Sequence, residues 1–193
     1  LIQIENELKR EDPDIKLRVI GIIETFPRFV SKEIKKYKYI IYAEDKPDLV
    51  LLSNLEKYLY EFSIMMFTVV FLKHIGVVSP VLIKNRSAGF LSLWYSVQQN
   101  FIKKMNLELN KPSIISASTL SNICVFELFK IITACVESEL INKAYLLNLE
   151  TLEGAFHKVA PHPLNFSYYE SNLKFMKPLS ADLIRSEERR VGK

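Results

Sequence analysis

One uninterrupted stretch, residues 67–72, constrains the fold more strongly than any other part of the sequence. It contains only aromatic, aliphatic or β-branched side chains, in the order Phe-Thr-Val-Val-Phe-Leu. A strand with one exposed face alternates apolar and polar residues, whereas a parallel strand covered on both faces is continuously apolar. Just before it, Leu52, Leu55 and Leu59 recur at helical spacing within residues 47–62. We therefore predict a helix that leads into a strand buried on both faces.

Helical and strand-like patterns alternate along the remainder of the chain. Helices are predicted at residues 2–10, 31–36 with Ser31 as N-cap, 47–62, 89–101 and 113–137. Strands are predicted at residues 15–20, 39–43, 67–72, 77–83, 143–151 and 155–159, the last two joined as a hairpin around Glu153 and Gly154. This order predicts an α/β fold with a mainly parallel sheet, helices on both faces and an antiparallel hairpin at its end.

Composition argues against several classes of protein. The 26 basic and 22 acidic residues are spread along the chain, which is not typical of a nucleic-acid-binding protein. No secretory signal follows Leu1, and the longest apolar run, residues 62–72, is too short to span a bilayer. Cys124 and Cys135 are both expected within helix 113–137, on one face, as buried free thiols. These features predict a cytoplasmic protein with no nucleic-acid or membrane partner.

The last nine residues, 185–193, look like a translated sequencing adapter rather than native sequence. They read Arg-Ser-Glu-Glu-Arg-Arg-Val-Gly-Lys and contribute four basic and two acidic residues. Without them, the formal charge of the chain falls from +4 to +2. The basic character of the sequence is therefore expected to be partly artefactual. Residues 166–184, which come before this stretch, are poorly patterned and are expected to form an extension of uncertain structure.

The residue types that usually carry chemistry do not fall into a recognisable catalytic pattern. The five glycines are too far apart to form the turn that brings backbone amides to a phosphate, so such a loop is either upstream of Leu1 or not used. His74, His157 and His162 have no nearby cysteine or acidic cluster, so we expect no metal site. Nothing in the spacing of Ser, His and Asp predicts a catalytic triad.

Asp45 is the one candidate ligand-binding residue. It follows the predicted strand 39–43 and would therefore lie at the C-terminal end of a parallel strand, where open α/β sheets bind ligands. A carboxylate in that position can hold the Mg²⁺ of a nucleotide. The alternative is an ordinary solvated turn, because residues 44–48 read Glu-Asp-Lys-Pro-Asp, the composition of a loop before a helix.

Two sets of segments resemble the ThiF-like superfamily, whose fold is that of ubiquitin-activating enzymes. The first set is residues 6–17 (NELKREDPDIKL) and 39–45 (YIIYAED). The second set is more specific, and resembles the branch of thiazole-containing bacteriocin maturation proteins: residues 121–130 (SNICVFELFK), 146–154 (LLNLETLEG), His157 and 161–164 (PHPL). The resemblance marks residues 1–165 as the C-terminal portion of a ThiF-like domain, and so predicts a piece of a larger protein.

The resemblance carries one site residue over to this chain. Asp45 matches the aspartate that helps to position Mg-ATP in catalytic members, but Lys46 stands where the family has asparagine and Tyr42 where it has an earlier aspartate. The paired cysteines that hold a structural zinc in many members are absent. The resemblance therefore implies a retained scaffold with no catalytic residue, metal or cofactor of its own.

The role that the resemblance implies is that of a partner protein. It would bind the leader of a precursor peptide and present the peptide to a YcaO-type cyclodehydratase that forms thiazoles or oxazoles. The leader-binding module is expected upstream of Leu1, and homodimer formation stays open. The alternative is an ATP-dependent adenylating enzyme whose nucleotide loop also lies upstream, which would use ATP and Mg²⁺. A generic dinucleotide-binding domain ranks third, because the final hairpin is not part of a simple doubly wound fold.

Overall fold

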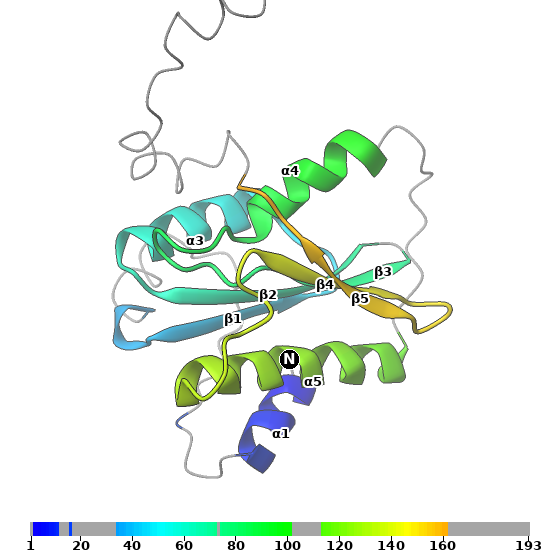
Figure 1. Cartoon of the computed structure of the whole chain (residues 1–193), viewed down its shortest axis with the longest axis horizontal. Coiled ribbons are helices and arrows are strands. Elements are labelled where there is room, and N and C mark those ends of the chain that lie inside the picture. Colours follow the sequence, from blue (N-terminus) through cyan, green and yellow to red (C-terminus); the bar gives the residue numbers. More distant parts are fainter. Residues whose placement is uncertain (1, 12–15, 17–33, 73, 102–112, 162–193) are drawn as a thin grey trace, which may run out of the picture.

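In the computed structural model, a five-stranded sheet lies between two layers of helices (Figure 1). The structure describes residues 2–11, 16, 34–72, 74–101 and 113–161. One face of the sheet is covered by α3 (Leu49–Glu61) and α4 (Phe90–Phe101), and the other by α1 (Ile2–Glu11) and α5 (Ile114–Thr133). The predicted α/β class, with helices on both faces, is confirmed.

The sheet has the order β1-β2-β3-β4-β5. Its strands are β1 (Tyr39–Glu44), β2 (Met65–Leu72), β3 (Ile75–Val78), β4 (Lys143–Asn148) and β5 (Gly154–Lys158), and a short 3-10 helix, η1 (Ile34–Lys36), precedes β1. β1 pairs with β2 in parallel, whereas β2–β3, β3–β4 and β4–β5 are antiparallel pairs. The predicted final hairpin is confirmed, but the expectation of a mainly parallel sheet is not confirmed for the described strands.

The direction of β3 explains this correction. Only two residues separate Leu72 from Ile75, and a parallel crossover needs a dozen or more, so the chain must turn back beside β2. β3 also begins and ends earlier than the predicted strand 77–83, because Pro80 has no N–H to donate to a ladder. The last bond before that proline runs from Ser79 N to Thr68 O, over 2.8 Å.

β2 separates two hydrophobic cores, as its sequence predicted. Met66 and Val70 pack with residues of α3 and α4, whereas Phe67, Val69 and Phe71 pack with residues of α1 and α5. On the first side, the leucines of the predicted α3 stripe are buried: Leu52, Leu55 and Leu59. Each face of the strand therefore contributes to a different core, and neither face meets solvent.

The helix ends agree with the sequence at the start of α3 and disagree at the end of α5. Asp48 is the N-cap of α3, and its carboxylate accepts hydrogen bonds from Val50 N and Leu51 N at 2.9 and 3.0 Å. α5 begins after the N-cap Ser113 but ends at Thr133, because Ala134 adopts a left-handed conformation with φ 52°. The predicted end at residue 137 was wrong.

This early end separates the two cysteines. Cys124 is buried in α5, where burial raises the pKa of its thiol to about 12 and the neighbouring Glu127 adds to the shift. Cys135 is exposed and lies after the helix. The prediction that both thiols are buried on one helix is therefore correct only for Cys124.

α5 is long and apolar enough, by length and composition alone, to cross a membrane. In this structure, its inner side is buried against the sheet and α1 through Leu120, Cys124 and Leu128. It also carries an ion pair between Glu127 and Lys130. Both features are typical of a core helix in a layered domain, and the apolar-run criterion did not single it out because polar residues interrupt the run.

Several expectations fall outside the described residues and stay predictions. These are the strand 15–20, the cap at Ser31, His162, the extension 166–184 and the adapter-like stretch 185–193. The predicted helix 2–10 is confirmed as α1, and the hairpin turn falls at residues 149–153, slightly before the expected position.

Replacing Ala134 by glycine should stabilise the protein. A left-handed residue with a Cβ is strained by roughly 1–2 kcal/mol, and glycine recovers that strain minus an entropic cost of about 0.5–1 kcal/mol. We expect Ala134→Gly to raise the free energy of unfolding by about 0.5–1 kcal/mol, measured by urea denaturation. The control Ala117→Gly, inside α5, should lower the free energy of unfolding instead. Equal effects of the two changes would contradict the left-handed conformation of Ala134.

Candidate functional site

Asp45 lies where the sequence placed it, immediately after the last residue of β1. It is exposed, and the next elements in the chain are the cap Asp48 and the first turn of α3. β1 and β2 run parallel, so Asp45 lies at the C-terminal end of a parallel pair. The predicted position is therefore confirmed, whereas its role in ligand binding stays a prediction.

Tyr42, at the position where the resemblance implies an aspartate, cannot supply a second carboxylate beside Asp45. Its ring is buried, with 6% of its surface exposed, and its hydroxyl donates a hydrogen bond to Glu44 Oε2. Burial raises the pKa of Tyr42 well above its ordinary value, and the hydrogen bond to Glu44 raises it further. The Tyr42 side chain therefore stays neutral at physiological pH, and its hydrogen bond engages the Glu44 carboxylate.

The remaining carboxylate in this loop is also in use. The Asp48 carboxylate accepts hydrogen bonds from the first amides of α3. Asp45 is therefore the carboxylate of this loop that could bind a ligand. Mg²⁺ prefers octahedral oxygen coordination, with one or two carboxylates assisted by the phosphates of a substrate. Within the part of the chain that the structure describes, no three His, Cys, Asp or Glu side chains gather closely enough to hold a metal ion. The loop offers a single acidic anchor.

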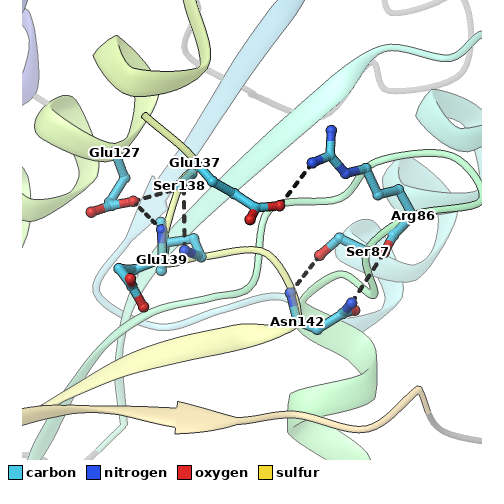
Figure 2. Close-up of polar contacts among 8 residues, drawn as sticks. Arg86, Ser87, Glu127, Glu137, Ser138, Glu139 and Asn142 are labelled. Atoms are coloured by element: carbon cyan, nitrogen blue, oxygen red, sulfur yellow. Dashed lines mark hydrogen bonds and ion pairs between the residues drawn. The ribbon is translucent and has the colours of Figure 1, made fainter. Parts of the chain in front are cut away.

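A second polar cluster surrounds Glu127 on α5, and Figure 2 shows its contacts with Ser138 and Glu139. Glu127 has 2% of its surface exposed, and its Oε1 lies 2.7 Å from Lys130 Nζ. Its Oε2 accepts hydrogen bonds from Ser138 Oγ and Glu139 N, both at 2.7 Å. Because its three contacts all lie within the fold, Glu127 fastens the segment after α5 to the helix.

The same segment is tied to the loop before α4 through Asn142 (Figure 2). Asn142 N donates to Ser87 Oγ at 2.9 Å, and its side-chain amide donates to Arg86 O at 3.1 Å. Its Oδ1 accepts from Ala88 N at 3.1 Å. An exposed ion pair joins Arg86 to Glu137 at 2.8 Å. These contacts join the loop before α4 to the segment after α5.

Glu56 is a buried acid that sequence reasoning missed. It lies on the apolar side of α3, with 1% of its surface exposed, and accepts bonds from Leu91 N at 3.3 and 3.4 Å. It therefore caps the first turn of α4 from a neighbouring helix. A Cβ at Gly89 would lie 2.4 Å from Glu56 Oε1, so the glycine makes room for the carboxyl. Burial raises the pKa of Glu56 to about 8, against the opposing effect of the amides of Leu91 and Phe90.

The histidines and cysteines do not form a catalytic group in the described structure. His74 Nδ1 lies 3.0 Å from Glu150 Oε1, and His157 lies on the exposed strand β5. Among the described contacts of these residues, no Ser-His-Asp or Cys-His arrangement occurs. Helical periodicity could not reveal Glu56 or Glu127, because their partners lie on other segments. The spacing of Glu127 and Lys130, three residues apart on a helix, was the one available signal.

No family model matches the sequence, and a comparison with curated proteins finds no relative. Solved structures do match. E. coli MccB crystallised with MccA has a TM-score of 0.59 and 13% identity, covering 83% of this chain and 47% of that chain. PaaA has a TM-score of 0.54 and 15% identity, with 81% and 54% covered. A heterocyclase in complex with substrate and cofactor has a TM-score of 0.50 and 14% identity, with 64% and 20% covered.

The chain shares the fold of the MccB and PaaA structures. This confirms the family resemblance at the level of fold, which is what a structural likeness at such low identity establishes. The chain spans about half the length of the MccB and PaaA structures that it matches. Activity, substrate and partners of the whole protein therefore do not follow from the likeness itself.

Removing the Glu127 carboxylate should destabilise the protein strongly. Glu127→Ala leaves the Ser138 hydroxyl, the Glu139 amide and the Lys130 ammonium without their acceptor in a buried position. We expect a loss of roughly 3 kcal/mol in unfolding free energy, measured by urea denaturation.

Glu137→Ala provides the matched control for that measurement. It removes a carboxylate from the same stretch of chain, but from an ion pair whose side chains are 60% and 69% exposed. The loss should be within about 0.5 kcal/mol. Similar losses for the two variants would contradict the view that Glu127 fastens the segment after α5.

The raised pKa of Glu56 predicts a pH dependence of stability. Between the ordinary value of 4.5 and the folded value of about 8, the folded state holds a proton that the unfolded state has lost. Stability should therefore fall as pH rises through this window, by at most about 1.4 kcal/mol per pH unit. Glu56→Gln keeps an acceptor for Leu91 N and cannot ionise, so it should flatten this slope and raise the melting temperature most at pH 8. An unchanged slope in the variant would assign the pH dependence to another group.

Proposed function

We propose that this chain belongs to a non-catalytic ThiF-like partner protein in the maturation of a thiazole- or oxazole-modified ribosomal peptide. The protein binds the precursor peptide through its leader and presents it to a YcaO-type cyclodehydratase, which carries out the heterocyclisation. It works in the cytoplasm and needs no cofactor of its own. A homodimer is compatible with this role but is not required by it.

The observation that carries the proposal is the set of hydrogen bonds that the polar residues make at the C-terminal end of β1. Catalytic relatives are expected to place several polar groups there around Mg-ATP, but here Tyr42 is neutral and bonded to Glu44, and Asp48 caps α3. Asp45 remains, followed by Lys46 in place of an asparagine. A single exposed carboxylate beside a lysine is a weak basis for nucleotide chemistry, so the retained fold favours a scaffold.

The structural neighbours support a peptide as the binding partner. E. coli MccB crystallised with MccA, and the heterocyclase with its substrate and cofactor. The sequence resemblance to bacteriocin maturation proteins points in the same direction and supplies the thiazole or oxazole product. The identity of the precursor peptide and of the cyclodehydratase would come from the genes that flank this one.

The second candidate is an ATP-dependent adenylating enzyme of the ThiF type. One observation favours it: Asp45 does lie at the C-terminal end of a parallel strand pair, the position at which such sheets bind ligands. This enzyme would activate a peptide carboxylate, and would need a glycine-rich loop and a basic nucleotide clamp outside the 193 residues of this chain.

Reconstitution of the maturation reaction separates the two candidates. The complete protein encoded by the gene is combined with the neighbouring cyclodehydratase, the precursor peptide and Mg-ATP, and the product is followed by mass spectrometry. We expect loss of one water per heterocycle only when all components are present, and no peptide-dependent pyrophosphate exchange by this protein alone. Such exchange would contradict the proposal and favour the adenylating enzyme.

Substitution of Asp45 provides a second comparison. Under the proposal, Asp45→Ala should leave the yield of heterocycles within about twofold of the wild type, because the residue touches neither enzyme nor nucleotide. If the protein is an adenylating enzyme, ATP affinity should fall at least about tenfold, the equivalent of 1.4 kcal/mol. Glu61→Ala, which removes an exposed carboxylate from the opposite end of α3, is the matched control in both assays.

A further inference from the structure

Three lysines from two segments, residues 35–38 and the loop at residue 84, lie near the C-terminal end of α3 and the start of β1, each above an aromatic ring. Lys35 Nζ lies 3.9 Å from the centroid of the Phe62 ring. Lys84 Nζ lies 5.6 Å from the centroid of Tyr60, and Lys38 Nζ lies 5.3 Å from that of Tyr39. We call Lys35, Lys38, Lys84 and these three rings the lysine–ring surface.

Main-chain and side-chain contacts hold the two lysine-bearing segments against α3 and β2. Tyr60 Oη donates to Asn85 Oδ1 at 2.7 Å, which ties the loop carrying Lys84 to α3. Met65 N donates to Lys38 O at 3.1 Å, which ties the residue before β1 to the first residue of β2. The rings of Tyr58 and Phe62 lie 4.7 Å apart. The relative positions of the lysines are therefore set by the fold.

The ammonium groups of this surface keep their charge available to a ligand. Lys35, Lys38 and Lys84 are exposed, and among the described residues none of them forms an ion pair with a carboxylate. Lys84 instead binds the carbonyl oxygen of Glu61 at 3.3 Å. Elsewhere in the described structure, Lys130 and Lys143 are each paired with a glutamate. A ring attracts an ammonium group without neutralising it.

We propose that the lysine–ring surface is a docking site for an acidic, extended segment of a polypeptide partner. Lysines that the rings and the α3 carbonyl already position lose less side-chain entropy on binding than mobile ones. Each presents one ammonium group, which suits single carboxylates spaced along a peptide. Long-range attraction adds little, because the net charge of the whole chain is small.

A polypeptide fits this surface better than a single-stranded nucleic acid does. Nucleic-acid platforms stack bases on the open faces of aromatic rings. Here, one face of Phe62, Tyr60 and Tyr39 is covered by a lysine ammonium group. The rings therefore position charge rather than offer a stacking face.

This inference stands apart from the proposed maturation role. The surface lies near the N-terminal end of β1, whereas Asp45 follows its C-terminal end, roughly 20 Å away along a six-residue strand. The two proposals are therefore tested separately. Acidic-peptide binding tests the lysine–ring surface, and heterocycle formation tests the maturation role.

Fluorescence anisotropy on the complete protein tests the surface directly. The probes are fluorescein-labelled peptides of alternating Glu and Ser, alternating Lys and Ser, or Ser alone, together with an oligothymidylate of similar length. We expect the Glu-Ser peptide to bind most tightly, with an affinity that falls as salt rises. Lys35→Gln/Lys38→Gln/Lys84→Gln should weaken it at least about tenfold.

Two sets of variants separate the surface from net charge. Lys46→Gln/Lys143→Gln/Lys158→Gln removes the same formal charge elsewhere on the domain and should change affinity by less than about threefold. Phe62→Leu and Tyr60→Leu keep every lysine but remove the rings that position them, and should weaken binding about two- to threefold. Circular dichroism and melting curves establish that each variant is folded.

The proposal is overturned by any of three results. The Glu-Ser peptide binds no more tightly than the Ser peptide; or the two triple lysine variants lose affinity equally; or oligothymidylate binds more tightly than the Glu-Ser peptide and is the probe that the surface variants release. A folded surface variant with a selective loss of the Glu-Ser peptide supports it.

Discussion

The fold depends on the burial of β2 on both of its faces. Its side chains alternate between two cores, one shared with α3 and α4 and the other with α1 and α5. Because neither face of the strand can meet water without exposing large apolar side chains, both helical layers are required together. The pairing of β2 with β1 and β3 then fixes where the polar residues at the two ends of β1 lie. The β1 terminus with Asp45 and the start of β1 beside the lysine–ring surface are consequences of that arrangement.

Two buried carboxylates join neighbouring segments by different means. Glu127 is bonded to an ammonium group, a hydroxyl and an amide, and it holds the segment after α5. Glu56 has only backbone donors at the start of α4, so burial dominates and its pKa is raised. Glu127 therefore fastens the segment after α5, whereas the raised pKa of Glu56 makes the link between α3 and α4 sensitive to pH. Both are structural, which agrees with a chain whose polar residues mainly maintain its fold.

Local patterns predicted the elements, whereas contacts between distant segments decided their directions and roles. The composition of β2, the leucine stripe of α3 and the final hairpin were all predicted correctly, because each depends on neighbouring residues. The direction of β3 was not, since it depends on a two-residue connection and on Pro80. The end of α5 was misplaced because Ala134 adopts a conformation that favours glycine. The position of Asp45 was predicted correctly. The hydrogen bond between Tyr42 and Glu44, which leaves Asp45 with few polar neighbours to share a ligand, could not be predicted from the sequence.

The comparisons show the fold that this chain shares with MccB and PaaA. The proposed function rests on the residues at the C-terminal end of β1. Its central claim is that the protein binds a precursor peptide without using ATP. Isothermal titration calorimetry of the complete protein with the precursor peptide, with and without Mg-ATP, tests this most directly. The account predicts saturable peptide binding with the same affinity in both conditions and no heat from Mg-ATP alone. Absence of peptide binding, or an affinity that Mg-ATP changes tenfold or more, the equivalent of about 1.4 kcal/mol of coupling, would contradict it.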